Sequence, residues 1–280
     1  MKQVAPLRYD VIFKKAFSQP EMFTALVNDL LDIQLEIDEV ENDKVFVPVV
    51  GKVATRFDLF AEDKKNRIII EVQHAHYSDT YERFVYYQCN AMVETIASSN
   101  NYSFPVTIIT LVFFTGKKAP SSGSGVLVHD FEARDLVTGK VIEEVYPRKH
   151  QLIFVFTNSL KKKKTPANYL EWMQAINDSL DKEVNEEDYT NPHIHRLFEL
   201  IEKDRISPEE YASMKEEYNR AESEKQAEEK GRKEGEEKGR KEGEEKTRIE
   251  MAQNFKALGT LTEEQIASAA GLSLEQVRAL

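Results

Sequence analysis

The stretch that most limits how this chain can fold is Arg56 to Gln73, RFDLFAEDKKNRIIIEVQ, which has the pattern of a β-hairpin. Apolar residues alternate with other residues on both sides of a four-residue polar segment, Asp63 to Asn66. Such alternation is typical of strands with one buried face, and a polar segment of this length is a common hairpin connection. A loop centred on this segment pairs Asp58 directly with Glu71, and the first residue of the stretch with the last.

One face of this hairpin is expected to be pure core, because side chains alternate between the two faces of a strand. That face carries Phe57, Leu59, Ala61, Ile68, Ile70 and Val72. The opposite face places Asp58 across from Glu71, with Cβ atoms roughly 5 Å apart. Two like charges there destabilise a sheet unless a positive charge lies between them. Two explanations remain open: a divalent cation, most simply Mg²⁺, held by carboxylate oxygens, or structural neutralisation by Arg56 or another cation.

Asp58, followed after the hairpin by Glu71-Val72-Gln73, resembles the D…ExK core of the PD-(D/E)XK nuclease superfamily, with glutamine in the lysine position. The neighbouring motifs are similar to those of one branch, the Rpn-type recombination-promoting nucleases and transposases. That branch tends to have D-x-x-F-K-x-x-F, a leucine-rich helix, the E-x-Q strand, a helix with an arginine and paired aromatics, and a hydrophobic strand after Y…P. The matches are Asp10, Phe13, Lys14 and Phe17, Glu21 to Leu31, Arg83, Tyr86 and Tyr87, Tyr102 and Pro105, and Val106 to Phe114.

The resemblance implies an α/β fold, with a mixed central sheet flanked by helices as in restriction endonucleases and a helical C-terminal extension. The order of strands and helices in the chain favours the same architecture. For activity, the resemblance implies a metal-dependent endonuclease that hydrolyses phosphodiester bonds in DNA. Asp58, Glu71 and the Val72 carbonyl would hold Mg²⁺, with Mn²⁺ or Ca²⁺ as alternatives.

Four further residues are candidates around this pair. Gln73 is the third catalytic candidate; it cannot act as a cation, but its amide can orient the attacking water. The resemblance also indicates Asp10, Lys14 and Arg83 as accessory residues. Asp10 and Lys14 have an alternative interpretation as a helix cap and a solvated lysine. The missing lysine and the acidic net charge keep a second function open: a catalytically weak DNA-associated or self-assembling protein that uses the nuclease fold as a scaffold.

Composition limits where such a protein works and what it binds. A single cysteine, Cys89, excludes an intramolecular disulfide and fits a reducing cytoplasm. The start of the chain lacks the apolar region of a signal peptide, and the longest apolar run, Phe104 to Phe114, is too short to cross a bilayer. The net charge of −11 argues against a protein that coats nucleic acid. We therefore expect a cytoplasmic protein with DNA as its partner and no membrane association.

The chain divides by composition into four segments. Residues 1–160 are expected to form the nuclease-like core, and residues 161–219 a helical extension that packs on it, with a capping box at Ser207 to Glu210. Residues 220–248 contain GRKEGEEK twice, a charged repeat without an apolar seam, and are expected to form a solvated helical spacer. Residues 249–280 have the pattern helix, Gly-Leu-Ser turn, helix, which resembles a helix-turn-helix.

The terminal segment has two interpretations. Its second helix is short and carries one cation, Arg278, so that either DNA reading or a packing and self-association module fits the pattern. A homo-oligomer formed through the C-terminal helical region is the partner expected in the second case.

Overall fold

The computed structural model describes residues 1–47, 53–74, 81–96, 101–116, 119, 123–160 and 164–280. The chain forms two compact units, Met1–Tyr218 and Asn219–Leu280. The finer division into four segments stays a prediction.

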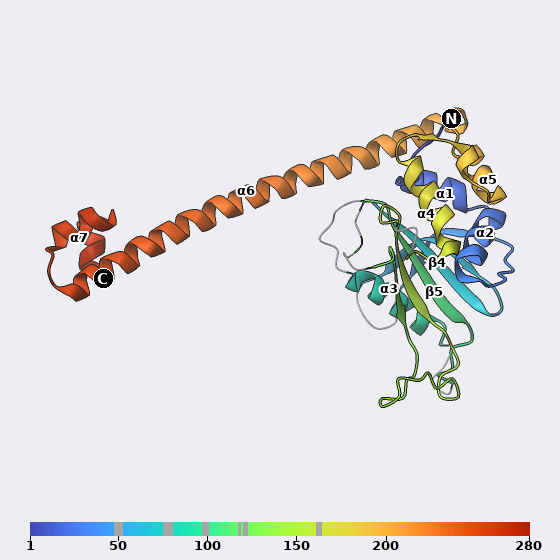
Figure 1. The fold of residues 1–280 in the computed structure, drawn as a ribbon, viewed down its shortest axis with the longest axis horizontal. Helices are drawn as coiled ribbons and strands as arrows, with labels where there is room; N and C mark the ends of the chain where they lie inside the picture. The colour runs from blue at the N-terminus through green and yellow to red at the C-terminus, as the bar shows by residue number, and fades with distance from the viewer. Residues whose placement is uncertain (48–52, 75–80, 97–100, 117–118, 120–122, 161–163) are drawn as a thin grey trace. The chain divides into compact units, whose positions relative to one another are not determined.

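The first unit is built on a mixed six-stranded sheet with the strand order β2-β3-β4-β5-β7-β6 (Figure 1). The three central strands β4, β5 and β7 are parallel, and the remaining neighbours pair antiparallel. β5 consists of apolar and β-branched residues and is buried on both faces, as its sequence predicts. The strands are β2 Glu41–Phe46, β3 Thr55–Glu62, β4 Asn66–Gln73, β5 Thr107–Phe114, β6 Val126–Asp130 and β7 Gln151–Phe156.

Helices cover both faces of this sheet, which confirms the predicted fold class. One face packs against α1 (Asp10–Phe17), α2 (Pro20–Leu31), α4 (Ala167–Ser179) and α5 (Pro192–Leu200), in a single large apolar core. The other face packs against α3 (Glu82–Glu94) (Figure 1). A short second sheet joins β1 (Lys2–Gln3) to β8 (Glu183–Val184), and two single-turn 3₁₀ helices, Glu186–Asp188 and Lys203–Arg205, complete the unit.

The β3–β4 hairpin has the predicted register from Leu59 with Ile70 to Glu62 with Arg67, and Asp63 to Asn66 lie between the last paired residues. Asp63 organises the turn, because its Oδ1 accepts hydrogen bonds from the backbone N–H groups of Lys65 (2.7 Å) and Asn66 (2.6 Å). The observed pairs are Leu59 with Ile70, Phe60 with Ile69, Ala61 with Ile68, and Glu62 with Arg67.

One prediction for the hairpin is wrong: Phe57 does not share a face with Leu59. Phe57 packs on the α3 side, where its ring lies 5.5 Å from that of Tyr87, whereas Leu59 belongs to the core on the opposite side. Phe60 also faces α3, so the alternation along β3 breaks between positions 57 and 60. In β2, beside this break, Asp43 has a φ of 56°, a left-handed conformation that regular strands do not contain.

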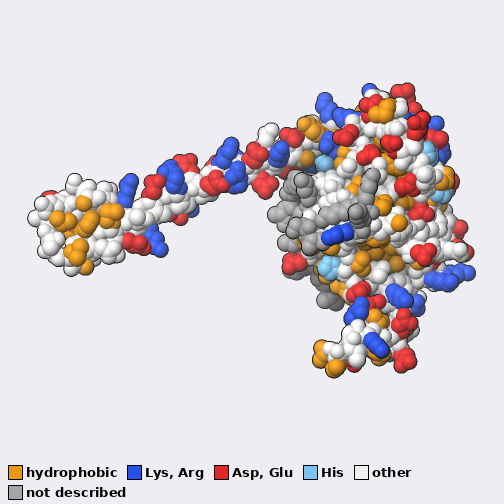
Figure 2. Space-filling view, in the orientation of Figure 1, with side chains coloured by type: hydrophobic (Ala, Val, Ile, Leu, Met, Phe, Trp, Pro, Cys, Tyr) orange, Lys and Arg blue, Asp and Glu red, His pale blue; other side chains and the backbone are white. Residues whose placement is uncertain are grey.

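Each of the C-terminal helices begins at a capping box, and the first of these boxes, Ser207 to Glu210, lies where the sequence predicts it. α6 (Pro208–Leu258) follows a reciprocal pair of hydrogen bonds between Ser207 and Glu210, and α7 (Glu263–Ala270) and α8 (Leu274–Ala279) follow equivalent pairs. Along the repeat, α6 carries exposed charged side chains of both signs, with i,i+4 ion pairs such as Arg232–Glu236 at 2.6 Å (Figure 2). Ala252 of α6 packs with four residues of α7 and α8: Ile266, Ala267, Ala270 and Val277.

Candidate active site

The two predicted carboxylates lie on adjacent antiparallel strands, and each is held by the other's backbone. Regular pairing between β3 and β4 is last seen at Leu59 and Ile70. Beyond it, the backbone N–H of Asp58 donates to Glu71 Oε1 at 3.1 Å, and the backbone N–H of Val72 donates to Asp58 Oδ2 at 2.9 Å. The hairpin therefore replaces two ladder hydrogen bonds with a pair of mutually supported carboxylates.

Burial makes this pair costly to ionise. Glu71 is 5% exposed, and burial raises its pKa well above the ordinary value, an effect that the charge of Asp58 increases. Burial also raises the pKa of Asp58 to about 6, with a further contribution from the charge of Asp10. The Val72 N–H and the Lys14 ammonium lower the pKa of Asp58, but they do not cancel the effect of burial. Both groups would gain from a cation bound between them.

The nearby side-chain cations are bound elsewhere. Arg56, which is largely exposed, donates to Asp43 from Nε (2.9 Å) and Nη2 (2.7 Å). Lys14 Nζ lies 2.7 Å from Asp10 Oδ2 and 2.6 Å from Asp43 Oδ1. Within the described ranges, neither Asp58 nor Glu71 forms an ion pair with a lysine or arginine. Arg56, one of the cations considered for structural neutralisation of the pair, therefore forms its ion pair with Asp43 instead.

The residues present fit a divalent cation. Asp10 Oδ1 is shielded from solvent and has no hydrogen-bond partner among the described residues, although Oδ2 of the same carboxylate binds Lys14. The described residues contain no cluster of three or more His, Cys, Asp or Glu side chains arranged for a metal. Mg²⁺ does not require such a cluster, because it is commonly held by one or two carboxylates, with water and substrate oxygens as the other ligands. Asp58 and Glu71 would hold it, with the Val72 carbonyl beside them.

Gln73 and Arg83 form the next contact along the site. Arg83 Nη2 donates to Gln73 Oε1 at 2.9 Å, and the guanidinium lies over the ring of Phe84, 4.7 Å from its centroid. The charge of Arg83 also lowers the pKa of Glu71, against the larger effect of burial. The structure thus brings the predicted accessory arginine to the residue in the lysine position.

The contacts of Asp10 and Lys14 do not match the alternative interpretation of these residues as a helix cap and a solvated lysine. Asp10 does not cap α1: Tyr9 is the N-cap residue, and Asp10 is already helical. Its backbone N–H instead donates to Glu217 Oε2 of α6 at 3.0 Å. Lys14 is not solvated either, because its side chain is 12% exposed and bridges two aspartates. Asp43 and Glu217 were not found from the sequence, since each contacts α1 from a distant part of the chain and belongs to no local motif.

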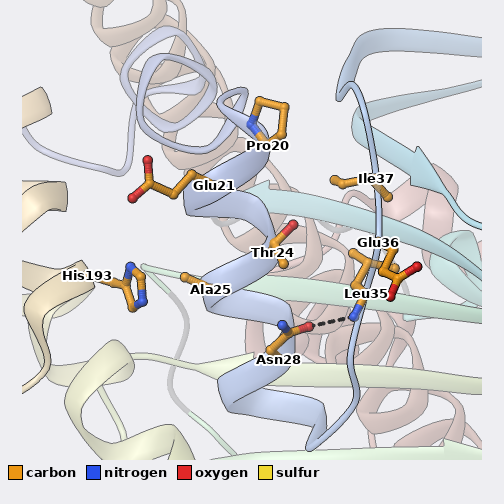
Figure 3. Close-up of a pocket in the computed structure, with 9 residues that line it drawn as sticks. All are labelled: Pro20, Glu21, Thr24, Ala25, Asn28, Leu35, Glu36, Ile37 and His193. Atoms are coloured by element: carbon orange, nitrogen blue, oxygen red, sulfur yellow. Dashed lines mark hydrogen bonds between the residues drawn. The ribbon is translucent and has the colours of Figure 1, made fainter.

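A separate hollow lies on α2, away from these residues. Its volume is about 400 Å³, and it is bordered by α2, by the extended segment at Leu35 to Ile37 and by His193 (Figure 3). Asn28 joins the two walls by accepting a hydrogen bond from the Leu35 N–H at 3.0 Å. None of the residues that line this hollow belongs to the candidate active site.

The mixed six-stranded sheet with helices on both faces is an α/β fold consistent with the PD-(D/E)XK nuclease class. The family model of the PD-(D/E)XK nuclease family transposases matches residues 7–230, and the chain belongs to this family. PD-(D/E)XK nucleases generally use divalent metal ions. No curated protein matches the chain. Among the helices that the structure describes, none combines the length and apolar character needed to span a membrane.

Proposed function

We propose that this protein is a metal-dependent DNA endonuclease, of the recombination-promoting or transposase-like kind. The observation that carries the proposal is the pair Asp58 and Glu71, one half-buried and one buried carboxylate held by backbone N–H groups of each other's strand, with no ion-paired lysine or arginine among the described residues. A fold that needed only stability would gain by replacing one of them. A site that binds Mg²⁺, Mn²⁺ or Ca²⁺ gains from both.

The reaction is hydrolysis of a phosphodiester bond. The oxygen of one water molecule bonds to phosphorus, one P–O bond of the backbone breaks, and the protons of water end on the leaving oxygen and in the solvent. A divalent ion supplies a more acidic water and charge stabilisation at the phosphate. Asp58 and Glu71 would hold that ion, and the Gln73 amide, fixed by Arg83, would orient the water. No sequence preference for the DNA follows from these contacts.

The proposal is tested by nicking of supercoiled plasmid with purified protein. Nicking is expected with Mg²⁺ or Mn²⁺, to stop with excess chelator, and to be lost in Asp58→Ala, which should remain folded because it removes one of two repelling groups. An Asp58→Ala protein that nicks as fast as the wild type would assign the activity to other residues or to a contaminant.

A second candidate function is a scaffold that binds DNA or assembles with itself without cutting. The specific observation that favours it is Gln73, because an amide lacks the charge that lysine would supply at this position. In that case the plasmid remains supercoiled with every metal, while DNA binding or assembly through the C-terminal helices is retained. The same nicking assay, combined with light scattering, separates the two functions.

A further inference from the structure

The candidate site has Gln73 where its motif would have a lysine. The position of the Gln73 side chain does not make up for the missing positive charge. Its Oε1 is occupied by Arg83 at 2.9 Å. An amide carries no net charge, so it cannot balance the charge that develops on a phosphate during hydrolysis. Any positive charge that a lysine would add to the charge of the metal ion therefore has to come from another residue.

Lys14 binds Asp43 of β2 at 2.6 Å, and the neighbours of Asp43 pair with the neighbours of Asp58 in β3: Asn42 with Leu59 and Lys44 with Phe57. The Lys14 ammonium lowers the pKa of Asp58 and of Glu71, in each case against the larger effect of burial. Burial pulls the pKa of Lys14 down, but hydrogen bonds to Asp10 and Asp43 raise it by more, so the group stays protonated. The side chain is therefore a permanent cation at the edge of the site.

The contacts of Lys14 leave one donor available. An ammonium has three N–H groups. In the described structure two of them bind Asp10 Oδ2 at 2.7 Å and Asp43 Oδ1 at 2.6 Å. The third has no protein acceptor among these residues, and the side chain keeps 12% of its surface exposed. A donor of this kind, fixed by two short contacts, suits an anionic oxygen that arrives from solvent.

The surrounding structure holds Lys14 in place. Phe13 and Phe17 on the same helix are fully buried, with ring centroids 4.7 Å apart, so that α1 is anchored in the core. Asp43 reaches Lys14 from within β2, where its backbone is left-handed, and Arg56 donates to the same oxygen. Position and charge are thus fixed before any ligand binds, which is the condition for effective electrostatic stabilisation.

We propose that Lys14 supplies, from helix α1, the positive charge that Gln73 cannot supply, by donating its third N–H to a non-bridging oxygen of the scissile phosphate. This inference rests on the proposed nuclease function. Lys14 transfers no proton: it keeps its charge while water adds to phosphorus and the P–O bond breaks. Its ligand is the phosphate oxygen of DNA, not the metal.

A purely structural role would explain the same contacts, because Lys14 joins α1 to β2 through two aspartates. Lys14→Gln separates the two roles. Glutamine keeps much of the length and can donate to both Asp10 and Asp43, but it has no charge. A structural lysine would be replaced at little cost, whereas a phosphate-binding cation would not.

The experiment measures plasmid nicking, Mn²⁺ binding by calorimetry in the absence of DNA, and thermal unfolding. For Lys14→Gln we expect nicking to fall about 100-fold. Mn²⁺ should bind at least as tightly as in the wild type, because a positive charge near the carboxylates has been removed. Lys44→Met is the control: this lysine on β2 pairs with Glu41 at 2.7 Å and should leave nicking and Mn²⁺ binding unchanged.

The double variant Lys14→Gln with Gln73→Lys provides the decisive arm. Returning a lysine to position 73 should restore nicking at least about tenfold over Lys14→Gln alone, since the charge then reaches the phosphate from the neighbouring strand. Wild-type nicking in Lys14→Gln, loss of its Mn²⁺ binding, or no restoration by Gln73→Lys would each overturn the inference. Failure of the nuclease function itself is distinguishable, because the wild-type protein would then show no Mg²⁺-dependent nicking above Asp58→Ala.

Discussion

A buried charged side chain lies near each end of strand β4, but the two side chains differ in the charge of the groups around them. At the start of the strand, which we call the matched end, Arg67 is 8% exposed and its charge has carboxylate partners. It donates to Glu62, to Glu94 at 2.5 Å and to the Ala91 carbonyl at 3.0 Å. Its guanidinium also lies over two aromatic rings, 5.2 Å from the centroid of Phe46 and 5.4 Å from that of Phe60.

Four positions later, Glu71 is buried to a similar degree and has a second carboxylate beside it in place of a cation. The chain therefore neutralises a buried charge with its own side chains at one end of β4, and among the described residues no lysine or arginine forms an ion pair with the carboxylates at the other end. The end of β4 at Glu71, which we call the unmatched end, is where a cation from outside the chain is expected to bind.

The sharpest test of this comparison is the same substitution at both ends. Glu71→Gln should reduce Mg²⁺-dependent nicking at least about 1000-fold, because the metal loses a charged ligand. Glu94→Gln, which removes a carboxylate from the matched end, should leave nicking within about threefold of wild type. Equal losses in a plasmid assay at matched folded concentration would contradict the comparison.

The matched end is instead expected to govern stability. Arg67→Met should lower the free energy of unfolding by about 2–4 kcal/mol, since it leaves Glu62 and Glu94 without their partner and the Ala91 carbonyl without its donor. Arg56→Met serves as the control, because that arginine is exposed, and should cost less than about 1 kcal/mol. Urea unfolding of both variants provides the measurement.

The unmatched end should destabilise the metal-free protein at neutral pH. The pKa of Asp58, about 6 in the folded state, lies above its ordinary value of 3.8. The folded state therefore holds this proton more tightly, so its contribution to stability is full below pH 3.8 and is lost as the pH rises through 6. Asp58→Asn keeps the acceptor for the Val72 N–H and should add about 1–3 kcal/mol at about pH 8 without metal.

The advantage of Asp58→Asn should disappear in urea titrations near pH 4, where the wild-type carboxyl is largely protonated. Added Mg²⁺ should likewise stabilise the wild type but not the variant. If the Asp58→Asn variant proves less stable than the wild type at about pH 8 without metal, the carboxylate pair does not carry the expected repulsion.

The smallest effect is expected at the unit boundary. A chain that ends at Asn219 retains Glu217 and its hydrogen bond to the Asp10 N–H, and should keep its unfolding free energy within about 0.5 kcal/mol and its nicking rate within about threefold. DNA affinity or oligomeric state is the property expected to change, as light scattering would show. A chain that ends at Ser207 loses Glu217 and, in addition, the ion pair between Lys15 and Glu210. Its unfolding free energy should be about 1 kcal/mol lower than that of the chain that ends at Asn219.

Local patterns predicted the parts of the site that depend on one hairpin. The register from Leu59 with Ile70 to Glu62 with Arg67 follows from alternation and loop length, which act over neighbouring residues, and Asp58 and Glu71 come next after these pairs. The face of Phe57 could not be predicted in the same way, because the break in β3 accompanies the left-handed Asp43 on β2, another strand. Alternation within a strand carries no information about an irregularity in its neighbour.

The surroundings of the pair depend on contacts between distant segments. Lys14 was predicted as an accessory residue from a motif, but its aspartate partner on β2 lies 29 residues away in sequence. The hydrogen bond between Asp10 and Glu217 spans 207 residues. No periodicity joins such positions; they meet because packing of α1 against the core and against α6 brings them together. The motif therefore predicted which residues belong to the site, and the fold decided how they are connected.

The hydrogen bond between Glu217 and Asp10 also determines how late in synthesis the candidate site can be completed. The N-terminal segment pairs with residues late in the first unit, Lys2 with Val184 and the Ala5 N–H with the Ile201 carbonyl at 2.8 Å, and Glu217 of α6 contacts the start of α1. A ribosome needs roughly 10–40 s to add the 207 residues between Asp10 and Glu217. Helix α1 is therefore synthesised early, but its contacts with late residues of the first unit can form only after those residues have been added. The candidate site is complete only when the first unit is nearly complete.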